Sequence, residues 1–268
     1  TALGSAYTLL AADITNGYAD VATGTLTNGT TYTINAKVID IAGNASAASG
    51  NFTTTVDTTA PTVSTVAITS ATGAQNSTLN AGDVVSATVT MSESVTVTGT
   101  PQLTLNIGGV NRIASYSSGS GTSALVFTYT IVAGDTDANG VSIAANSLAL
   151  NSGTIADLAG NAATITHAAV ADNASYLVDT TAPSAPSITS VTDNVGSITG
   201  ALTTGGRTDD TDLTVKVSLT GTNAVAGDTI QLYNSTTALG SAYTLLAADI
   251  TNGFANVQTG TLTNGTTY

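Results

Sequence analysis

The sequence contains no cysteine and no tryptophan, and positive charge is scarce: two lysines and two arginines stand against seventeen acidic residues, for a formal net charge of −13. Four cations cannot neutralise the phosphates of a nucleic acid, and the same shortage excludes an anionic membrane surface as a partner. No apolar run approaches the roughly 18 residues of a membrane span. We therefore expect no nucleic acid partner and no membrane insertion. Without disulfides, an exported chain needs another way to hold its parts together.

Glutamate is nearly absent as well. Sixteen of the seventeen acidic residues are aspartate, and Glu93 is the only glutamate. Helical surfaces are normally rich in glutamate and lysine. Aspartate is typical of turns, where its short carboxylate caps backbone amides or binds a hard cation. The acid composition therefore indicates turns and, with them, candidate cation ligands.

The clearest positive signal is strand periodicity. Runs rich in threonine and valine alternate apolar and polar residues, and clusters of glycine, asparagine, aspartate and serine separate them, as is typical of antiparallel strands with one wet face. The residues expected to point inward are Leu213, Val215, Val217 and Leu219; Leu103, Leu105 and Ile107; Leu125, Phe127, Tyr129 and Ile131; and Tyr32, Ile34, Ala36 and Val38. No long segment has a 3.6-residue period, so the sequence predicts an all-β chain without a helix longer than about two turns.

A long repeat and a repeated hexapeptide define the organisation. Residues 1–32 return as residues 237–268, at an offset of 236, and only three aligned positions differ: Tyr18/Phe254, Asp20/Asn256 and Ala22/Gln258. The hexapeptide VDTTAP occurs at Val56–Pro61 and at Val178–Pro183. Its proline holds the preceding residue extended and cannot donate to a strand ladder, which suits a short, stiff connector.

Together these repeats predict modules of two types. The expected division is the C-terminal half of a type 1 module in residues 1–57, a linker in 58–61, a complete type 2 module in 62–179, a linker in 180–183, and the N-terminal part of a type 1 module in 184–268.

Each module is expected to be a β-sandwich, because modules of about 110–120 residues with seven or so short strands fit that architecture. In LTNGTTY (Leu26–Tyr32) a leucine precedes a tyrosine by six residues across an Asn-Gly turn. This spacing is typical of the tyrosine corner of Greek-key sandwiches. A tyrosine that is merely a core residue of its strand is the alternative. The fold prediction is tandem Greek-key Ig-like β-sandwiches arranged end to end.

Longer stretches carry a family resemblance. DTTAPSAPSITSVTDNVGSITG together with TTYTINAKVIDIAGNASAASGNFTTTVDTTAP resembles one class of bacterial Ig-like domain, and TAPTVSTVAITSATGAQNSTLNAGDVVSATVTMSESVTV resembles a second class that often alternates with it. Both resemble the repeats of giant, type-I-secreted, biofilm-associated-type adhesins. The resemblance implies an extracellular or cell-surface location, a Gram-negative bacterium, neighbouring modules of the same chain or fibre as partners, and contact with a host or biofilm surface through other modules.

Acidic residues are expected to meet at the junctions between modules, because loops at the two ends of a chained sandwich face the neighbouring modules. The first junction would collect Asp57, Glu93, Asp157 and Asn161; the second would collect Asp179, Asp135, Asp137, Asn139, Asp228, Asp40 and Asn44; Asp193, Asp209 and Asp210 would face a junction of the first kind. Calcium, with 6–8 oxygen ligands, would remove the repulsion among such carboxylates. The alternative is that these aspartates cap turns through their own backbone.

One of these clusters resembles a known calcium loop in part. GDTDANG, residues 134–140, matches the first six positions of a D-x-D-x-N-G loop, but the twelfth position is Asn146 instead of a bidentate glutamate. No helices are expected beside it. The segment is therefore not an EF-hand.

Catalytic chemistry has few candidates. His167 is the only histidine, it lies in an alternating segment without a nucleophile elbow, and we interpret it as a structural or surface residue. A single glutamate excludes a Glu/Glu glycosidase pair, while an Asp pair stays open. We expect no enzyme. The leading interpretation is a structural spacer stiffened by calcium; a glycan- or cell-binding module is the alternative, although such surfaces usually present exposed aromatics, and we expect most tyrosines in strand cores.

If the chain is a window on a longer array, the residues that follow Tyr268 in the parent gene should read close to TINAKVIDIAGNASAASG, the sequence that follows Tyr32. Sequencing the gene tests this. A stop codon soon after Tyr268 would contradict it and would leave a strand-donating polymer, in which residues 1–57 of one copy complete residues 184–268 of the next. The 32 overlapping residues argue against that design, because both partners would supply the same strands.

Overall fold

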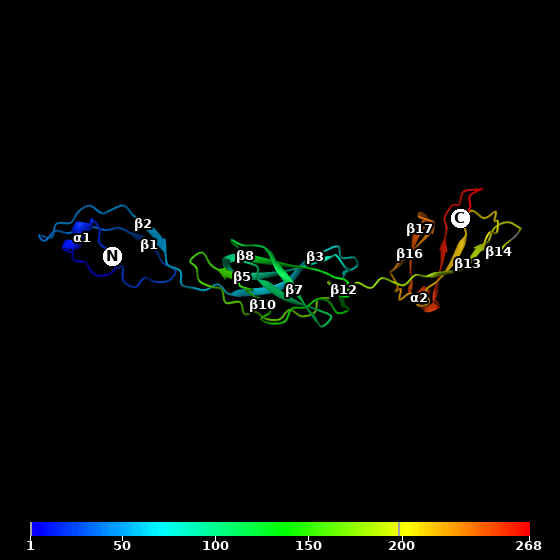
Figure 1. Ribbon diagram of the computed structural model, residues 1–268, viewed down its shortest axis with the longest axis horizontal. Helices are drawn as coiled ribbons and strands as arrows, with labels where there is room; N and C mark the ends of the chain where they lie inside the picture. Colours follow the sequence, from blue (N-terminus) through cyan, green and yellow to red (C-terminus); the bar gives the residue numbers. More distant parts are fainter. Residues whose placement is uncertain (1, 198) are drawn as a thin grey trace. The chain divides into compact units, whose positions relative to one another are not determined.

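The computed structural model describes residues 2–197 and 199–268, which fall into two compact units divided between Thr180 and Thr181. Regular structure in both units is almost entirely β-sheet (Figure 1). The helices of the described residues have six residues each: α1 (Ala11–Asn16) and α2 (Ala247–Asn252). The prediction of an all-β chain with no helix beyond two turns is confirmed. Neither helix has the length and apolar character that crossing a membrane requires.

Residues 2–57 contain α1 and one strand pair, β1 (Thr31–Ile34) and β2 (Phe52–Thr55), which run antiparallel. No residue between 2 and 57 is buried. The prediction that Ala36 and Val38 continue an inward-facing strand is wrong, because β1 ends at Ile34 and both residues are exposed. Their backbone N–H groups donate to the hydroxyls of Ser49 and Ser46 instead of extending the ladder.

Residues 62–179 form two sheets. The larger has the order β10-β6-β7-β8-β5-β11, with β3 also paired to β5, and the smaller has the order β4-β12-β9. Their strands are β3 (Val63–Thr72), β4 (Thr78–Leu79), β5 (Val84–Thr98), β6 (Gln102–Ile107), β7 (Val110–Ser118), β8 (Thr122–Thr130), β9 (Thr136–Asp137), β10 (Leu148–Ala149), β11 (Thr154–Ala156) and β12 (Leu177–Asp179). Only β4 and β12 pair in parallel among these neighbours.

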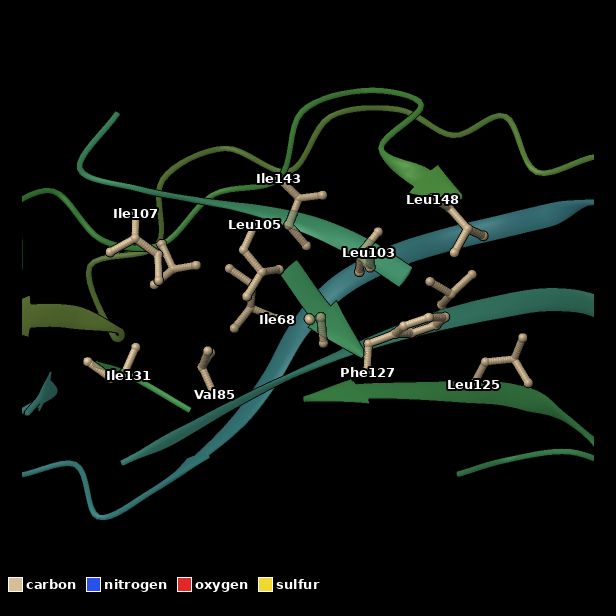
Figure 2. Packing of buried hydrophobic residues seen from close by; sticks show 14 of the residues in the cluster. Ile68, Val85, Leu103, Leu105, Ile107, Leu125, Phe127, Ile131, Ile143 and Leu148 are labelled. Carbon is tan, nitrogen blue, oxygen red and sulfur yellow. The ribbon is translucent and has the colours of Figure 1, made fainter. Parts of the chain in front are cut away.

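The two sheets share one hydrophobic core. Alternate residues of β6 and β8 point into it, and Figure 2 shows Leu103, Leu105 and Phe127 facing one another there. Leu79 and Val178 bring the smaller sheet into the same cluster. The predicted inward faces of these strands are confirmed, except that Tyr129 is only half-buried. The arrangement is that of a β-sandwich-like layer pair, as period-2 strands with one apolar face require.

The second unit is smaller. Its strands are β13 (Ser187–Asp193), β14 (Gly200–Ala201), β15 (Thr214–Ser218), β16 (Thr229–Asn234), β17 (Thr237–Thr244) and β18 (Phe254–Gln258). They form a sheet in the order β14-β13-β15-β18 and the hairpin β16-β17. Val215, Val217 and Leu219 enter its core together with Leu245 and Val257. The predicted inward face of residues 213–219 is confirmed.

The two copies of the repeat fold alike locally. In the first, Asp13 Oδ2 accepts from Leu10 N (2.8 Å) and from Tyr7 Oη (3.1 Å) at the start of α1. Asp249 accepts from the equivalent groups at the start of α2, at 2.8 and 2.9 Å. Each helix ends at a glycine with positive φ, 79° at Gly17 and 73° at Gly253.

The hydrogen bond of the predicted tyrosine corner is present in both copies. Tyr32 Oη accepts from Thr27 N, and Tyr268 Oη accepts from Thr263 N, each at 2.8 Å. A phenol that accepts from a backbone N–H five residues upstream fixes the turn at the start of the strand. These backbone donors lower the pKa of both tyrosines.

An ion pair between buried Asp135 and half-buried Arg112 holds the loop after β8. Asp135 is buried, and its carboxylate accepts from Arg112 Nε (2.6 Å), Tyr129 Oη (2.9 Å) and Val132 N (3.1 Å). Desolvation by itself raises the pKa of Asp135, but these donors outweigh it and hold the pKa below its usual range. A carboxylate in such a site depends on its partners, since an unpaired buried charge is costly.

Replacing Arg112 with methionine should destabilise the first unit by about 3 kcal/mol, because the Asp135 carboxylate loses its cation while it stays buried. Chemical unfolding at neutral pH measures the change. Arg207, the only other arginine, is exposed, so Arg207→Met is the control and should change stability by less than about 0.5 kcal/mol. Equal effects of the two substitutions would contradict this assignment.

Candidate metal site at the first linker

Three carboxylates from distant parts of the chain meet beside the first linker. Asp57, Glu93 and Asp157 each offer an oxygen atom, and these atoms lie within 4.8 Å of one another. Asp157 is buried, and the other two are half-buried. Within residues 2–197 and 199–268, this is the one group of three or more acidic or histidine side chains that comes so close. We call it the acidic triad.

Asp157 is held by the tight loop DLAGN. Asn161 donates twice to its carboxylate, from backbone N to Oδ1 and from Nδ2 to Oδ2, both at 2.8 Å. Gly160 closes the turn with a φ of 93°, which favours glycine. The side-chain bond from Asn161, opposed by desolvation and assisted by backbone N–H donors, lowers the pKa of Asp157. The carboxylate is therefore ionised at neutral pH.

Glu93 lies in an irregular part of β5. The strand pairs with β8 as far as Thr90 and resumes the pairing at Val95, so the residues between them leave the register. Ser92 ties this segment to the end of the linker: its N–H donates to Thr62 O (2.8 Å), and Thr62 N donates to Ser92 Oγ (3.0 Å). The break in pairing brings the only glutamate of the chain to the linker.

Asp57 directly precedes the linker, and two asparagine side chains bind this stretch of chain. Asn28 Oδ1 accepts from Thr58 N (2.8 Å), and Asn28 Nδ2 donates to Thr59 Oγ1 (2.7 Å). Asn161 Nδ2 donates to Asp57 O (3.1 Å). Asp57 Oδ1 accepts from Thr59 N (2.9 Å). A primary amide suits this place because it both donates and accepts.

The sequence predicted Asn161 at this junction but missed Asn28 and Ser92. Asn28 stands in the Asn-Gly turn that the tyrosine corner uses, so its side chain was explained by the turn alone. Ser92 lies next to Glu93, which the sequence predicted in a loop after a strand and the structure places within β5, and neither position gives a direction for its hydroxyl. Both residues act through hydrogen bonds to residues 30 or 31 positions away in the sequence.

The triad suits a hard divalent cation such as calcium. Three carboxylates can supply three to six oxygen ligands, and calcium takes 6–8 at 2.3–2.6 Å. Two ligands on opposite sides of one ion are then about 5 Å apart, which agrees with the 4.8 Å limit within the triad. Thiol and imidazole ligands, which transition metals prefer, are absent from the group.

The GDTDANG segment distributes its side chains differently from a converging calcium loop. Asp135 turns inward to Arg112, whereas Asp137 accepts from the backbone N–H of Gly108 (2.7 Å), Asn139 (3.2 Å) and Gly140 (2.8 Å). Asn139 donates its side-chain amide to Asp172. Each polar group thus has its own partner within the protein, as the turn-capping alternative describes.

The remaining predicted ligands of the second junction are spread over the chain. Asp179 ends β12 and pairs with Thr136 across the strands. Asp228 Oδ2 accepts from Val225 N (2.9 Å) within its own turn in the second unit. Asp40 and Asn44 form a loop with the same bonds as Asp157 and Asn161, at 2.7 and 2.9 Å.

Asp193 and Asp210 are buried in the second unit. Asp193 accepts from Thr208 Oγ1 (2.6 Å) and Val195 N (3.0 Å). Asp210 accepts from Asp212 N (2.8 Å) and Asn194 N (3.2 Å). Asp209 is exposed. Asp193 and Asp210 thus link the residues that follow β13 to the long loop between β14 and β15.

His167 is buried and binds backbone. Its Nε2 accepts from Ser147 N (2.9 Å) and Leu148 N (3.2 Å), so Nδ1 carries the proton and donates to Ala168 O (2.8 Å). These bonds fix the neutral tautomer and join residues about 20 positions apart in the chain. They agree with the interpretation of His167 as a structural residue.

No family model, curated protein or solved structure matches the chain. The candidate site therefore stands on its geometry and chemistry.

The two DxAGN loops give a matched test of the Asp157 environment. Asn161→Ala should raise the pKa of Asp157 and leave Asp40 unchanged, and Asn44→Ala should do the reverse, because each asparagine donates to one carboxylate. Where the pKa of a carboxyl is lower in the folded protein than in the unfolded chain, its ionisation stabilises the fold at any pH above the unfolded-state pKa. This stability is lost as the pH falls through the folded-state pKa. Carbon-13 NMR titration of the two carboxyls is the measurement. An unchanged pKa in both variants would contradict these assignments.

Proposed function

We propose that this chain is a structural spacer from an extracellular array, in which Ig-like modules repeat along a large adhesin or surface fibre and calcium binds at the linkers. The observation that carries the proposal is the acidic triad, which lies at a linker whose sequence the chain uses twice. Repetition of one unit at near identity is typical of proteins that gain length by adding modules.

The linker contacts support a role in transmitting orientation. A connector of a few residues orients its flanking segments only when side groups hold it, and here Asn28, Asn161 and Ser92 bind its backbone or its ends. The triad adds three negative charges at the same place. Without a cation these charges repel one another and oppose the geometry that the hydrogen bonds favour.

A bound calcium ion would reverse that effect. It would link Asp57 of the linker to Glu93 of β5 and Asp157 of the DLAGN loop, which lie 36 and 100 residues further along the chain. Because the triad assembles only in the folded protein, the ion stabilises the fold by about 2.7 kcal/mol at a hundredfold excess over its dissociation constant. The chain contains no disulfide that could do this instead.

Calcium should raise the melting temperature of the first unit by roughly 5–11 °C, and chelator should remove the increase. Asp57→Asn and Glu93→Gln should each abolish most of this response, because they remove a negative charge and one of the two carboxylate oxygens without changing side-chain size. Calorimetry at millimolar calcium and titration with a luminescent lanthanide measure stability and binding directly.

Asp40→Asn is the matched control, since Asp40 sits in the same loop motif but belongs to no group of three metal-ligating side chains among the described residues. That variant should keep the full calcium response. Absence of a calcium response in the unmodified chain, or equal losses in Asp40→Asn and Asp57→Asn, would refute the proposal. If calcium leaves the stability of the chain unchanged and the chain binds glycans on an array, the alternative of a glycan- or cell-binding module would be favoured instead.

A further inference from the structure

The hexapeptide VDTTAP occurs at both linkers, but the protein binds its two copies differently. At the first linker, Thr58 N donates to Asn28 Oδ1 (2.8 Å). At the second linker, the hydroxyl of Thr180, at the equivalent position, donates to Asp135 O and accepts from Gly134 N, both at 2.9 Å. Identical local sequences therefore meet different binding groups, which belong to the residues that precede each linker.

The Thr180 hydroxyl binds at the point where a strand ladder ends. The antiparallel pairing of β12 with β9 ends at Asp179 and Thr136, and the next residues in this register are Thr180 and Asp135. There a side-chain hydroxyl, which can donate and accept at once, binds the chain that precedes β9. We call these two hydrogen bonds the Thr180 anchor. Thr180 is half-buried, whereas residues 181–183 are exposed, so the exposed part of the linker begins after the anchor.

The turn that receives the Thr180 hydroxyl is itself held in place. Asp135 N donates to Val132 O (3.0 Å), and Val132 N donates to the Asp135 carboxylate (3.1 Å), which closes the turn from both sides. The same carboxylate accepts from Arg112 of β7 and from Tyr129 of β8. The linker is thus bound to a turn whose position two strands of the large sheet fix.

Neutral groups make the contacts of the anchor. The Thr180 hydroxyl binds a backbone carbonyl and a backbone N–H, and neither partner carries a charge that a cation would have to neutralise. Within the part of the chain that the structure describes, three metal-ligating side chains come together only in the acidic triad, beside the first linker. The contacts of the Thr180 anchor therefore need no cation.

We propose that Thr180 is a positioning residue that fixes the direction in which the chain leaves residues 62–179, with or without calcium. The two linkers would then respond differently to chelation, which would loosen the first and leave the anchor of the second in place. Pro183 adds to the restriction, because it holds the residue before it extended. The inference goes beyond the proposed function, since no residue of the triad takes part in the anchor.

Amide hydrogen exchange at Gly134 measures the anchor directly, because this N–H donates to the Thr180 hydroxyl. Thr180→Val removes the hydroxyl and keeps the shape of the side chain. Exchange at Gly134 should become roughly two- to tenfold faster, as expected for the loss of one hydrogen bond. Thr180→Ser keeps a hydroxyl and should restore most of the protection. At a temperature where the chain stays folded, the rate at Gly134 should be the same in calcium and in chelator.

Thr58→Val is the matched control, because Thr58 stands at the same position of the other hexapeptide and is bound through its backbone N–H. It should leave exchange at Gly134 unchanged. Exchange at Phe127, a buried residue of β8, gives the reference for global stability and should be the same in all these variants. Faster exchange at Gly134 in chelator, or no difference between Thr180→Val and Thr180→Ser, would overturn the proposal.

Spin labels measure the direction of the chain, and they attach to engineered cysteines alone because the chain has no cysteine of its own. One label at Ser115, exposed on β7, and one at Ala182, exposed in the linker, give a distance distribution across the anchor. Thr180→Val should broaden this distribution, because the chain after β12 loses its bonds to the turn. Thr58→Val and chelator should both leave its width unchanged.

A second pair of labels separates this proposal from the proposed function. Labels at Thr53 and Ser115, both exposed, span the first linker, and their distance distribution should broaden in chelator if calcium holds the triad together. An unchanged distribution for that pair would refute the calcium function and leave the Thr180 anchor unaffected. Broadening of the Ser115–Ala182 distribution in chelator, or no broadening in Thr180→Val, would overturn the anchor, whatever the other pair shows.

Discussion

The apolar face of each sheet has to be covered, because strands with a period of two place every second side chain on one side. In residues 62–179 two sheets cover each other, and Leu105, Phe127 and Val178 share one core. In the second unit, Val215, Val217 and Ile230 pack against Leu245 and Val257. Leu9 and Val21, at the equivalent positions of the first repeat, are exposed. The local sequence therefore determines which strands and helices form, whereas a hydrophobic core forms only where a second layer packs against the apolar face.

Aspartate serves three physical purposes in this chain. Asp135 is a buried partner of Arg112, Asp137 accepts backbone N–H groups of its own turn and of Gly108, and Asp57 and Asp157 meet Glu93 in the acidic triad. The triad carboxylates also accept backbone N–H groups, at Asp57 and Asp157. What distinguishes the candidate calcium site from a turn is therefore the approach of three carboxylates to within 4.8 Å of one another.

At the first linker, amide side chains and the triad act on a connector of a few residues. Electrostatic repulsion within the triad opposes the geometry that these hydrogen bonds favour. The proposed function depends on a divalent cation to remove that repulsion.

The sequence by itself determined the strand character, the inward residues of β6, β8 and β15, the repeat and the bond of the tyrosine corner, since these depend on neighbours within a few positions. It also brought Asp57, Glu93 and Asp157 to one junction through a general argument about loop ends. It placed Ala36 and Val38 in a buried strand, yet β1 ends at Ile34 and the backbone N–H groups of both residues donate to serine hydroxyls, with both side chains exposed. Tertiary structure alone decided that Asp135 faces Arg112 and that Asn28 and Ser92 hold the linker. Those outcomes depend on which side chain reaches a group about 20 to 30 residues away, and local periodicity carries no information at that range.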